Sequence, residues 1–237
     1  SSRELNWGVS SSVTMSQFGL YLRKYGLLSN TKINVLNGNY DDPLGDVDLF
    51  LKNNVDHAIL LPFFDILMPS FEAQLACMSE DVISSKEAEL RGRYRLALQK
   101  GGSMKVIFLC TLHSMNPLVD FSGNDVSRAI LNRFNMALRE EWRQFPNVRV
   151  IDTEDILGFI GYQRAFDSRF YFRSKAPYTS VFFDELAKRI SLATRGFGAH
   201  FYKALILDCD NTLWGGVIGE DLLSGIGLDK HDYPGNI

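Results

Sequence analysis

The chain has few cysteines and no long hydrophobic run. Its 237 residues include three cysteines, Cys77, Cys110 and Cys209, which lie far apart. No Cys-x-x-Cys pair or Cys/His metal spacing occurs, so we expect no disulfide framework and no zinc site, and a reduced, cytoplasmic setting. No apolar run reaches the roughly 20 residues of a bilayer span, and the first residues, SSRELNWGVSSS, lack the pattern of a signal peptide. The sequence therefore predicts no membrane partner.

An excess of charge of one sign is also missing. Lys and Arg number 25 and Asp and Glu 28, which gives a formal net charge of -3. The densest basic segment, residues 86–100, mixes Arg91, Arg93 and Arg95 with glutamates, a pattern typical of a solvated helix face. We therefore expect no nucleic-acid partner. Hydrophobic residues make up 46% of the chain and charged residues 22%, which excludes a disordered chain.

Short apolar segments alternate with helical patterns along the first 194 residues. Five segments have the composition of buried strands: 5–9, 32–36, 57–62, 105–111 and 148–151. Four regions have helical periodicity: 14–25, 66–100 with a break near Ser79, 125–145 and 180–192. Strict alternation predicts an α/β fold, a three-layer α/β/α sandwich with a mainly parallel five-stranded sheet.

A second domain is predicted after this sandwich. Residues 195–203, RGFGAHFYK, break the pattern with two glycines and indicate a linker, and a new strand is expected over 204–207. We therefore divide the chain into a first domain, 1–198, and a segment, 199–237, that contains the linker and the start of the next domain.

The residues with the strongest chemical signal follow that expected strand. Residues 203–221 read KALILDCDNTLWGGVIGED, with Asp208 and Asp210 at the mouth of an apolar strand. Two carboxylates so close together would repel each other without a cation, and Mg²⁺ prefers such oxygen ligands. One carboxylate can then attack phosphorus while the other moves protons. Thr212 can fix the loop by hydrogen bonding, and Gly215 and Gly216 suit a tight turn.

This motif resembles the first motif of the haloacid dehalogenase (HAD) superfamily of phosphatases and phosphoryl transferases, a Rossmann-like fold. The longer string DCDNTLWGGVIGED is similar to the FkbH-like branch. The resemblance implies that Asp208 is the nucleophile that becomes an aspartyl phosphate and that Asp210 is the general acid/base. Asp208 and the backbone carbonyl of Asp210 would hold Mg²⁺, whereas Cys209 would serve packing.

Thr212 joins the two aspartates as a catalytic residue, and we expect Asn211, Gly215 and Gly216 to bind substrate. The remaining HAD motifs, a Ser or Thr, a Lys and a distal acid, are not found before Ile237. We therefore expect a truncated second domain that is a weak or inactive catalyst alone. The resemblance further implies a phosphorylated small-molecule substrate, 1,3-bisphosphoglycerate, from which a glyceryl unit is loaded onto an acyl carrier protein.

FkbH-like proteins carry an amino-terminal domain that resembles SGNH hydrolases, and the first domain fits that pattern. Here VSSSVTMSQF replaces the GDS motif, which places Val13 at the nucleophile position and Phe64 at the oxyanion-hole asparagine. The segment SKAPYT lacks the catalytic histidine. We therefore expect Ser10, Ser11 and Ser12 to cap the helix over 14–25 rather than to catalyse.

Three further side chains were weighed as site residues or as structure. His113 lies at the carboxyl end of a strand, where sites occur, and is expected to be either a packed residue or an exposed loop residue. Asp65 is expected to cap a helix, and His57 to be structural. Three functions stay open: a HAD-type phosphatase, a non-catalytic module that docks a carrier protein, and a divergent esterase.

Overall fold

The computed structural model describes residues 3–69, 74, 78–115, 126–194 and 207–227. The chain divides into two compact units, Ser1–Arg195 and Gly196–Ile237, which we describe separately. The predicted linker and residues 204–206 of the predicted strand lie outside the described residues, as do Cys77 and His200. Leu207 is described and is not part of a strand.

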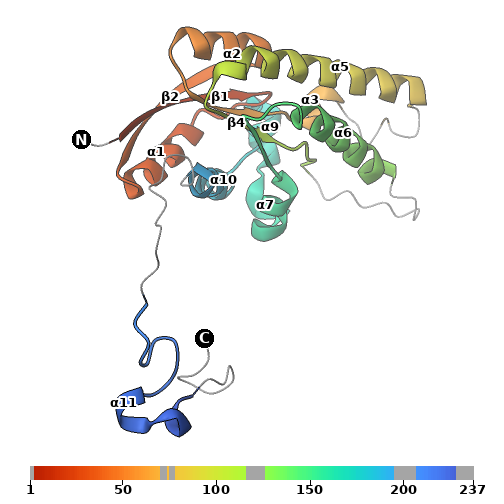
Figure 1. Ribbon diagram of the computed structural model, residues 1–237. Helices are drawn as coiled ribbons and strands as arrows, with labels where there is room; N and C mark the ends of the chain where they lie inside the picture. Colours follow the sequence, from red (N-terminus) through yellow and green to blue (C-terminus); the bar gives the residue numbers. More distant parts are fainter. Residues whose placement is uncertain (1–2, 70–73, 75–77, 116–125, 195–206, 228–237) are drawn as a thin grey trace. The chain divides into compact units, whose positions relative to one another are not determined.

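The first unit is built on a five-stranded parallel sheet with the order β2-β1-β3-β4-β5 (Figure 1). The strands are β1 (Arg3–Ser11), β2 (Thr31–Tyr40), β3 (His57–Leu61), β4 (Val106–Cys110) and β5 (Val148–Ile151). This order is the doubly wound one in which the direction of the chain reverses next to β1. Ligands of such sheets bind at the carboxyl ends of the strands, on either side of that reversal.

Helices cover both faces of the sheet and complete a three-layer α/β/α sandwich (Figure 1). The helices of the first unit are α1 (Phe18–Leu28), α2 (Pro43–Lys52), α3 (Phe64–Leu67), α5 (Glu80–Lys100), α6 (Val126–Trp142), α7 (Thr153–Ile160), α8 (Tyr162–Ala165), α9 (Ser168–Ser174) and α10 (Ser180–Thr194). Helices α2, α5 and α6 pack together over one face, and α1, α7 and α10 over the other. None of the helices in the described ranges has both the length and the apolar character of a membrane span.

The two central strands carry the core. Every residue of β3 and β4 is buried, as the apolar composition of these segments after His57 predicts. On one face, Leu60 and Ile107 join a cluster with Phe50 of α2, Leu98 of α5 and Phe134 of α6. Full burial of an aliphatic or Phe side chain contributes about 1.5–3 kcal/mol. Burial of β3 and β4 on both faces of the sheet is therefore the main contribution to the stability of the first unit.

The sequence-based boundaries are confirmed at β5 and corrected elsewhere. The break near Ser79 is confirmed, because Ser79 Oγ caps the start of α5 by accepting from Val82 N at 3.4 Å. The helix predicted over 14–25 begins at Phe18, and its N-cap, Gln17, makes no side-chain capping bond. The expected serine cap is therefore wrong. The prediction that Asp65 caps a helix is also wrong, since Phe63 is the N-cap of α3.

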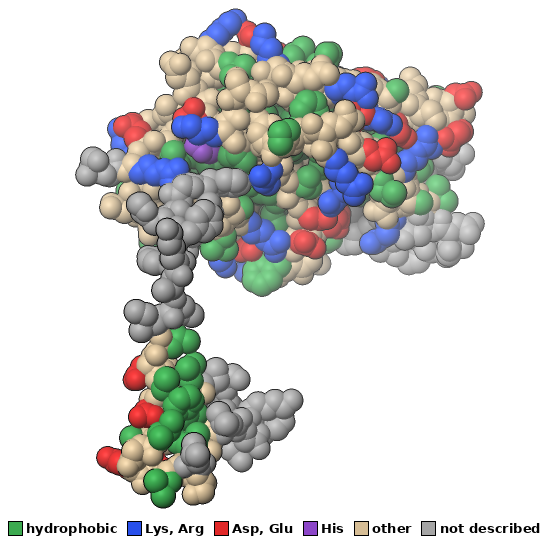
Figure 2. All heavy atoms as spheres, viewed as in Figure 1, with side chains coloured by type: hydrophobic (Ala, Val, Ile, Leu, Met, Phe, Trp, Pro, Cys, Tyr) green, Lys and Arg blue, Asp and Glu red, His purple; other side chains and the backbone are tan. Residues whose placement is uncertain are grey.

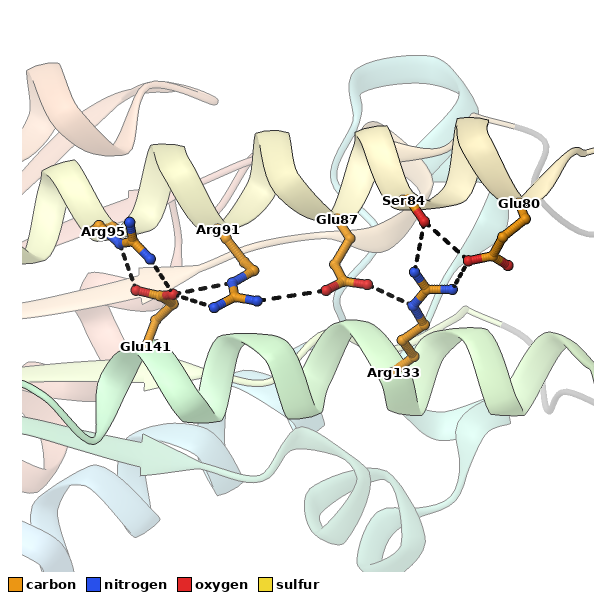
Figure 3. A network of polar contacts seen from close by, with 7 residues as sticks. All are labelled: Glu80, Ser84, Glu87, Arg91, Arg95, Arg133 and Glu141. Carbon is orange, nitrogen blue, oxygen red and sulfur yellow. Dashed lines mark hydrogen bonds and ion pairs between the residues drawn. The ribbon is translucent and has the colours of Figure 1, made fainter.

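Basic and acidic side chains are interspersed on the face of the first unit that Figure 2 shows. The segment 86–100, interpreted as a solvated helix face, has a further role that this pattern does not indicate. Two of its arginines, Arg91 and Arg95, cross from α5 to a buried carboxylate on α6, Glu141, whose side chain is 0% exposed (Figure 3). The third, Arg93, pairs with Asp41. Arg95 donates to Glu141 at 2.7 and 2.5 Å, and Arg91 at 3.1 and 2.6 Å.

The network continues along both helices. Arg133 of α6 pairs with Glu87 at 2.6 Å and with Glu80, and donates to Ser84 at 2.9 Å (Figure 3). The hydrogen bonds from Arg95, followed by those from Arg91, lower the pKa of Glu141 to about 2. The carboxylate thus stays charged, and the arginines join the two helices.

Replacing Glu141 with Gln tests this network. Removal of one partner of a buried pair is strongly destabilising, but Arg91 and Arg95 are 33% and 47% exposed and can rehydrate. We expect E141Q to lower the free energy of unfolding by about 1–2 kcal/mol in urea titrations. The adjacent exposed Glu140 provides the control, E140Q, which should change it by less than about 0.5 kcal/mol. Equal effects of the two variants would contradict the role of Glu141.

Candidate functional site

Asp208 is the first residue of the loop for which phosphoryl chemistry is predicted. Its side chain is exposed, and Oδ1 accepts the N–H of Cys209 at 2.9 Å. All charged side chains in residues 207–227 are acidic: Asp208, Asp210, Glu220 and Asp221. An anionic ligand would be repelled by this charge unless a cation accompanied it.

The carboxylate of Asp210 is held in place within the loop. Its Oδ1 accepts from the indole Nε1 of Trp214 at 3.1 Å and from the backbone N–H of Ile218 at 3.3 Å. Both donors bind the same oxygen, so they fix the direction in which the carboxylate points. Sequence reasoning missed Trp214 as a positioning residue, although its place four residues after Asp210 was a usable signal.

The turn after Asp210 gives the loop its shape. Asn211 adopts a left-handed conformation, with φ of 54°, and its Oδ1 accepts from Gly216 N at 3.0 Å. Gly216 has φ of 102°, which L side chains rarely adopt, so a residue with a side chain would be strained there. Gly215 exchanges backbone hydrogen bonds with Gly227 at 2.9 and 2.8 Å.

These contacts bear differently on the sequence predictions. Asn211, Gly215 and Gly216 shape the loop, while their contact with substrate stays a prediction. Thr212 donates its N–H to the Cys209 carbonyl at 3.3 Å, and its catalytic role likewise stays a prediction. Cys209 is exposed, so the expected packing role is wrong for the described residues.

The loop offers part of a metal site. No group of three His, Cys, Asp or Glu side chains within the described ranges could hold a metal ion. Asp208 and Asp210 nonetheless supply carboxylate and carbonyl oxygens, the donors that Mg²⁺ prefers. Mg²⁺ is commonly bound by one or two carboxylates together with water and substrate phosphate, so the donor set fits this ion.

Two of the three serine hydroxyls at the carboxyl end of β1 are bound to acidic side chains, while Ser11 Oγ accepts the N–H of Val13. Ser10 Oγ donates to Asp46 Oδ2 at 2.6 Å, and Ser12 Oγ donates to Asp41 Oδ1 at 2.7 Å. Ser10 and Ser12 are 3% and 5% exposed, and Asp46 is fully buried. Sequence reasoning missed Asp46, which is 36 residues from its partner. The hydroxyls of Ser10 and Ser12 therefore stabilise the fold and are shielded from a substrate.

The residues at the other positions of a hydrolase motif are also buried in the core. Val13 and Phe64, at the nucleophile and oxyanion positions of the motif, are 3% and 1% exposed. His113 is fully buried, its Nε2 is 2.9 Å from the Tyr178 hydroxyl, and its ring lies edge-on to Phe63. The expectation of a packed His113 is confirmed.

His57 is structural as well. Its ring stacks on Trp7 with centroids 5.0 Å apart, and both side chains are buried. Burial lowers the pKa of His57 and of His113 to about 4, so both are neutral near pH 7. Phe182 and Phe183 are buried, whereas Phe172 is 77% exposed.

No protein-family model and no curated protein matches the sequence. The structure is similar to the N-terminal part of protein BF1531 from Bacteroides fragilis, which contains a phosphatase domain and was crystallised with Mg. The TM-score is 0.70 at 18% identity, over 94% of this chain and 60% of that chain. It is also similar to the lipase Lip_vut3 from a goat rumen metagenome, with a TM-score of 0.55 at 14% identity, over 82% of this chain and 99% of the lipase.

These likenesses establish the α/β fold and its three-layer architecture, which hydrolases share. The chain spans 60% of the length of the BF1531 structure. At such identities, the activities of these proteins do not transfer to this chain.

Acid titration tests the burial of His113. Its pKa is about 4 in the folded chain and near 6.5 when unfolded, so the unfolded chain binds the extra proton and stability falls as the pH drops from about 6.5 to 4. We expect H113Q to reduce this pH slope by about 1 kcal/mol per pH unit, measured by urea unfolding. The comparison is anchored at pH 8, where the native histidine is already neutral. An unchanged slope would show that His113 is accessible to protons in the folded state.

Proposed function

We propose that this chain belongs to a Mg²⁺-dependent phosphatase or phosphoryl transferase of the HAD type, within or near the FkbH-like branch. The observation that carries the proposal is the loop in which Asp208 is exposed while Trp214 and Ile218 hold the carboxylate of Asp210. This arrangement separates a nucleophile from a fixed proton carrier. The similarity to the BF1531 structure agrees with it at the level of the fold.

The two aspartates divide the chemistry. A carboxylate oxygen of Asp208 attacks phosphorus, the bond from phosphorus to the leaving oxygen breaks, and Asp210 gives that oxygen a proton. Asp210 then takes a proton from water, whose oxygen attacks the aspartyl phosphate and releases phosphate. Asp208 and the backbone carbonyl of Asp210 would hold Mg²⁺, which would supply positive charge to offset the charge of the phosphoryl oxygens.

The substrate and partner are finer proposals. The resemblance to FkbH-like proteins supports 1,3-bisphosphoglycerate as the phosphorylated substrate and an acyl carrier protein thiol as the acceptor of the glyceryl unit. The uniformly acidic loop supports a substrate that binds together with a cation. The low number of cysteines supports a cytoplasmic location.

The first unit is proposed to be a non-catalytic module that docks the carrier protein. The buried pairs Ser10–Asp46 and Ser12–Asp41 support this role, because neither hydroxyl is free to act as a nucleophile. They count against the third hypothesis, a divergent esterase, which needs a serine activated by a base. Both described histidines are buried, and His113 is bonded to Tyr178.

Phosphate release tests the enzymatic proposal. The full-length gene product is assayed with p-nitrophenyl phosphate and Mg²⁺, as wild type and as D208N. We expect a loss of roughly a thousand-fold or more, because the amide cannot form the covalent intermediate. Glu220 is an exposed acid of the same unit, and E220Q is the matched control with an expected rate near that of wild type. Wild-type rates in D208N would refute the assignment of Asp208.

The docking proposal has a separate test. The chain is titrated with an acyl carrier protein in isothermal calorimetry, and saturable binding is expected. A protein of similar size and net charge that carries no acyl group is the control. Absence of binding, or equal binding of the control, would contradict a docking role without bearing on the Asp208 chemistry.

A further inference from the structure

A pocket of about 220 Å³ opens at the carboxyl ends of β1 and β2, in the first unit. Its polar lining comes from Ser11, Thr14, Ser16, Asn37 and Asn39, and Tyr40 stands at the rim. Parallel α/β sheets bind ligands at this edge of the sheet. No step of the chemistry proposed for Asp208 and Asp210 uses the residues that line this pocket.

One wall of the pocket is formed by a β-bulge between β1 and β2. Val9 pairs with Asn37 and Ser11 pairs with Tyr40, so β2 carries one more residue than β1 over this stretch. Such bulges concentrate next to functional sites, where they redirect side chains. The bulge turns two neighbouring residues of β2, Gly38 and Asn39, into the pocket lining.

A buried carboxylate holds this wall. Asp46 Oδ1 accepts the backbone N–H of Asn39 at 2.5 Å and its side-chain Nδ2 at 3.3 Å, while Oδ2 accepts from Ser10. Burial raises the pKa of Asp46, and its three donors oppose that effect. Burying a carboxylate is costly unless it is fully hydrogen-bonded. Its position ties α2 to both strands and fixes the shape of the pocket.

The lining defines the chemistry of a ligand. Hydroxyl and carboxamide groups supply the polar contacts, and no Lys, Arg, Asp or Glu lines the pocket within the described residues. Ser11 Oγ accepts the N–H of Val13 at 3.2 Å and keeps its own proton to donate, whereas Thr14 donates to the Ser174 carbonyl and keeps lone pairs to accept. Both a donor and an acceptor therefore face the space, without a charge.

We propose that this pocket binds a small neutral polyhydroxyl molecule, a single sugar ring or a polyol. Pockets for drug-sized ligands measure roughly 300–1,000 Å³, so this one admits a single small ring. Tyr40 is 52% exposed at the rim and provides an aromatic surface for the apolar face of a sugar ring. The proposal does not depend on phosphatase activity.

Saturation-transfer NMR on the 237-residue chain tests it. The probes are glucose, galactose and myo-inositol, together with glucose 6-phosphate as a charged counterpart. We expect saturation transfer to at least one neutral probe, and at least roughly ten-fold weaker binding of glucose 6-phosphate, because no cation lines the pocket. No transfer to any neutral probe, or equal binding of glucose 6-phosphate, would overturn the proposal.

Two variants place the binding in this pocket. A Cβ at Gly38 would lie 2.2 Å from the carboxyl carbon of Asp46, so G38A displaces the carboxylate that holds the wall. Tyr40 is 52% exposed, so Y40A removes its ring with a smaller packing loss than at a buried position and remains informative if G38A does not fold. We expect each folded variant to weaken binding of the neutral probe by roughly ten-fold.

The matched control is F159A, since Phe159 is an aromatic residue of α7 that is 70% exposed and lies outside the pocket. It should bind the neutral probe like wild type. Unchanged binding in Y40A, or an equal loss in F159A, would overturn the assignment to this pocket.

Discussion

Burial of the parallel sheet on both faces is the constraint on which the first unit depends. Because β4 and the residues of β3 after His57 are apolar, polar groups are concentrated at the strand ends and in the contacts between helices. The buried titratable groups Asp46, His113 and Glu141 have internal partners there: Asp46 binds Ser10 and Asn39, His113 binds Tyr178, and Glu141 binds two arginines. Three buried ring nitrogens, Trp7 Nε1, His57 Nδ1 and Trp142 Nε1, have no hydrogen-bond partner among the described residues. A buried group without a partner would cost a large part of the stability of a domain.

The same constraint explains why two serines at the edge of the sheet, Ser10 and Ser12, are not available to act on a substrate. A serine nucleophile needs a base within reach and an open path to substrate. The hydroxyls of Ser10 and Ser12 donate hydrogen bonds to buried or partly buried carboxylates, and Nε2 of His113 is hydrogen-bonded to Tyr178. In the loop of the second unit, by contrast, Asp208 is exposed and Asp210 is oriented by neighbours in the sequence. The proposed reaction is therefore placed in the loop, and recognition in the first unit.

The sequence predicts features that depend on local composition. Strand β5 was predicted with its observed bounds, and Ser79 was recognised as the break before α5. Helix α2 was missed, although Asp42 as N-cap followed by proline is a standard start signal. The serine cluster was assigned to a helix cap because its true partners, Asp46 and Asp41, are 36 and 29 residues away.

Contacts between residues far apart in the sequence could not be predicted from local patterns. Glu141 lies 50 residues from Arg91, and the alternation of charges along α5 does not reveal that α6 buries a carboxylate against it. The loop of the second unit was the reverse case, because Asp208 and Asp210 lie two residues apart and their pattern was readable from the sequence, although the contact of Trp214 with Asp210 was missed. Its chemistry is a proposal and its local geometry is a finding.

Trapping the covalent intermediate tests the central claim most directly. The full-length protein is mixed with acetyl phosphate and Mg²⁺, quenched, reduced with borohydride and digested for mass spectrometry. If Asp208 is the nucleophile, its side chain carries the phosphoryl group and is recovered as the reduced alcohol, and omission of Mg²⁺ suppresses the product. Phosphate turnover with an unmodified Asp208, or with the group on another residue, would contradict the account.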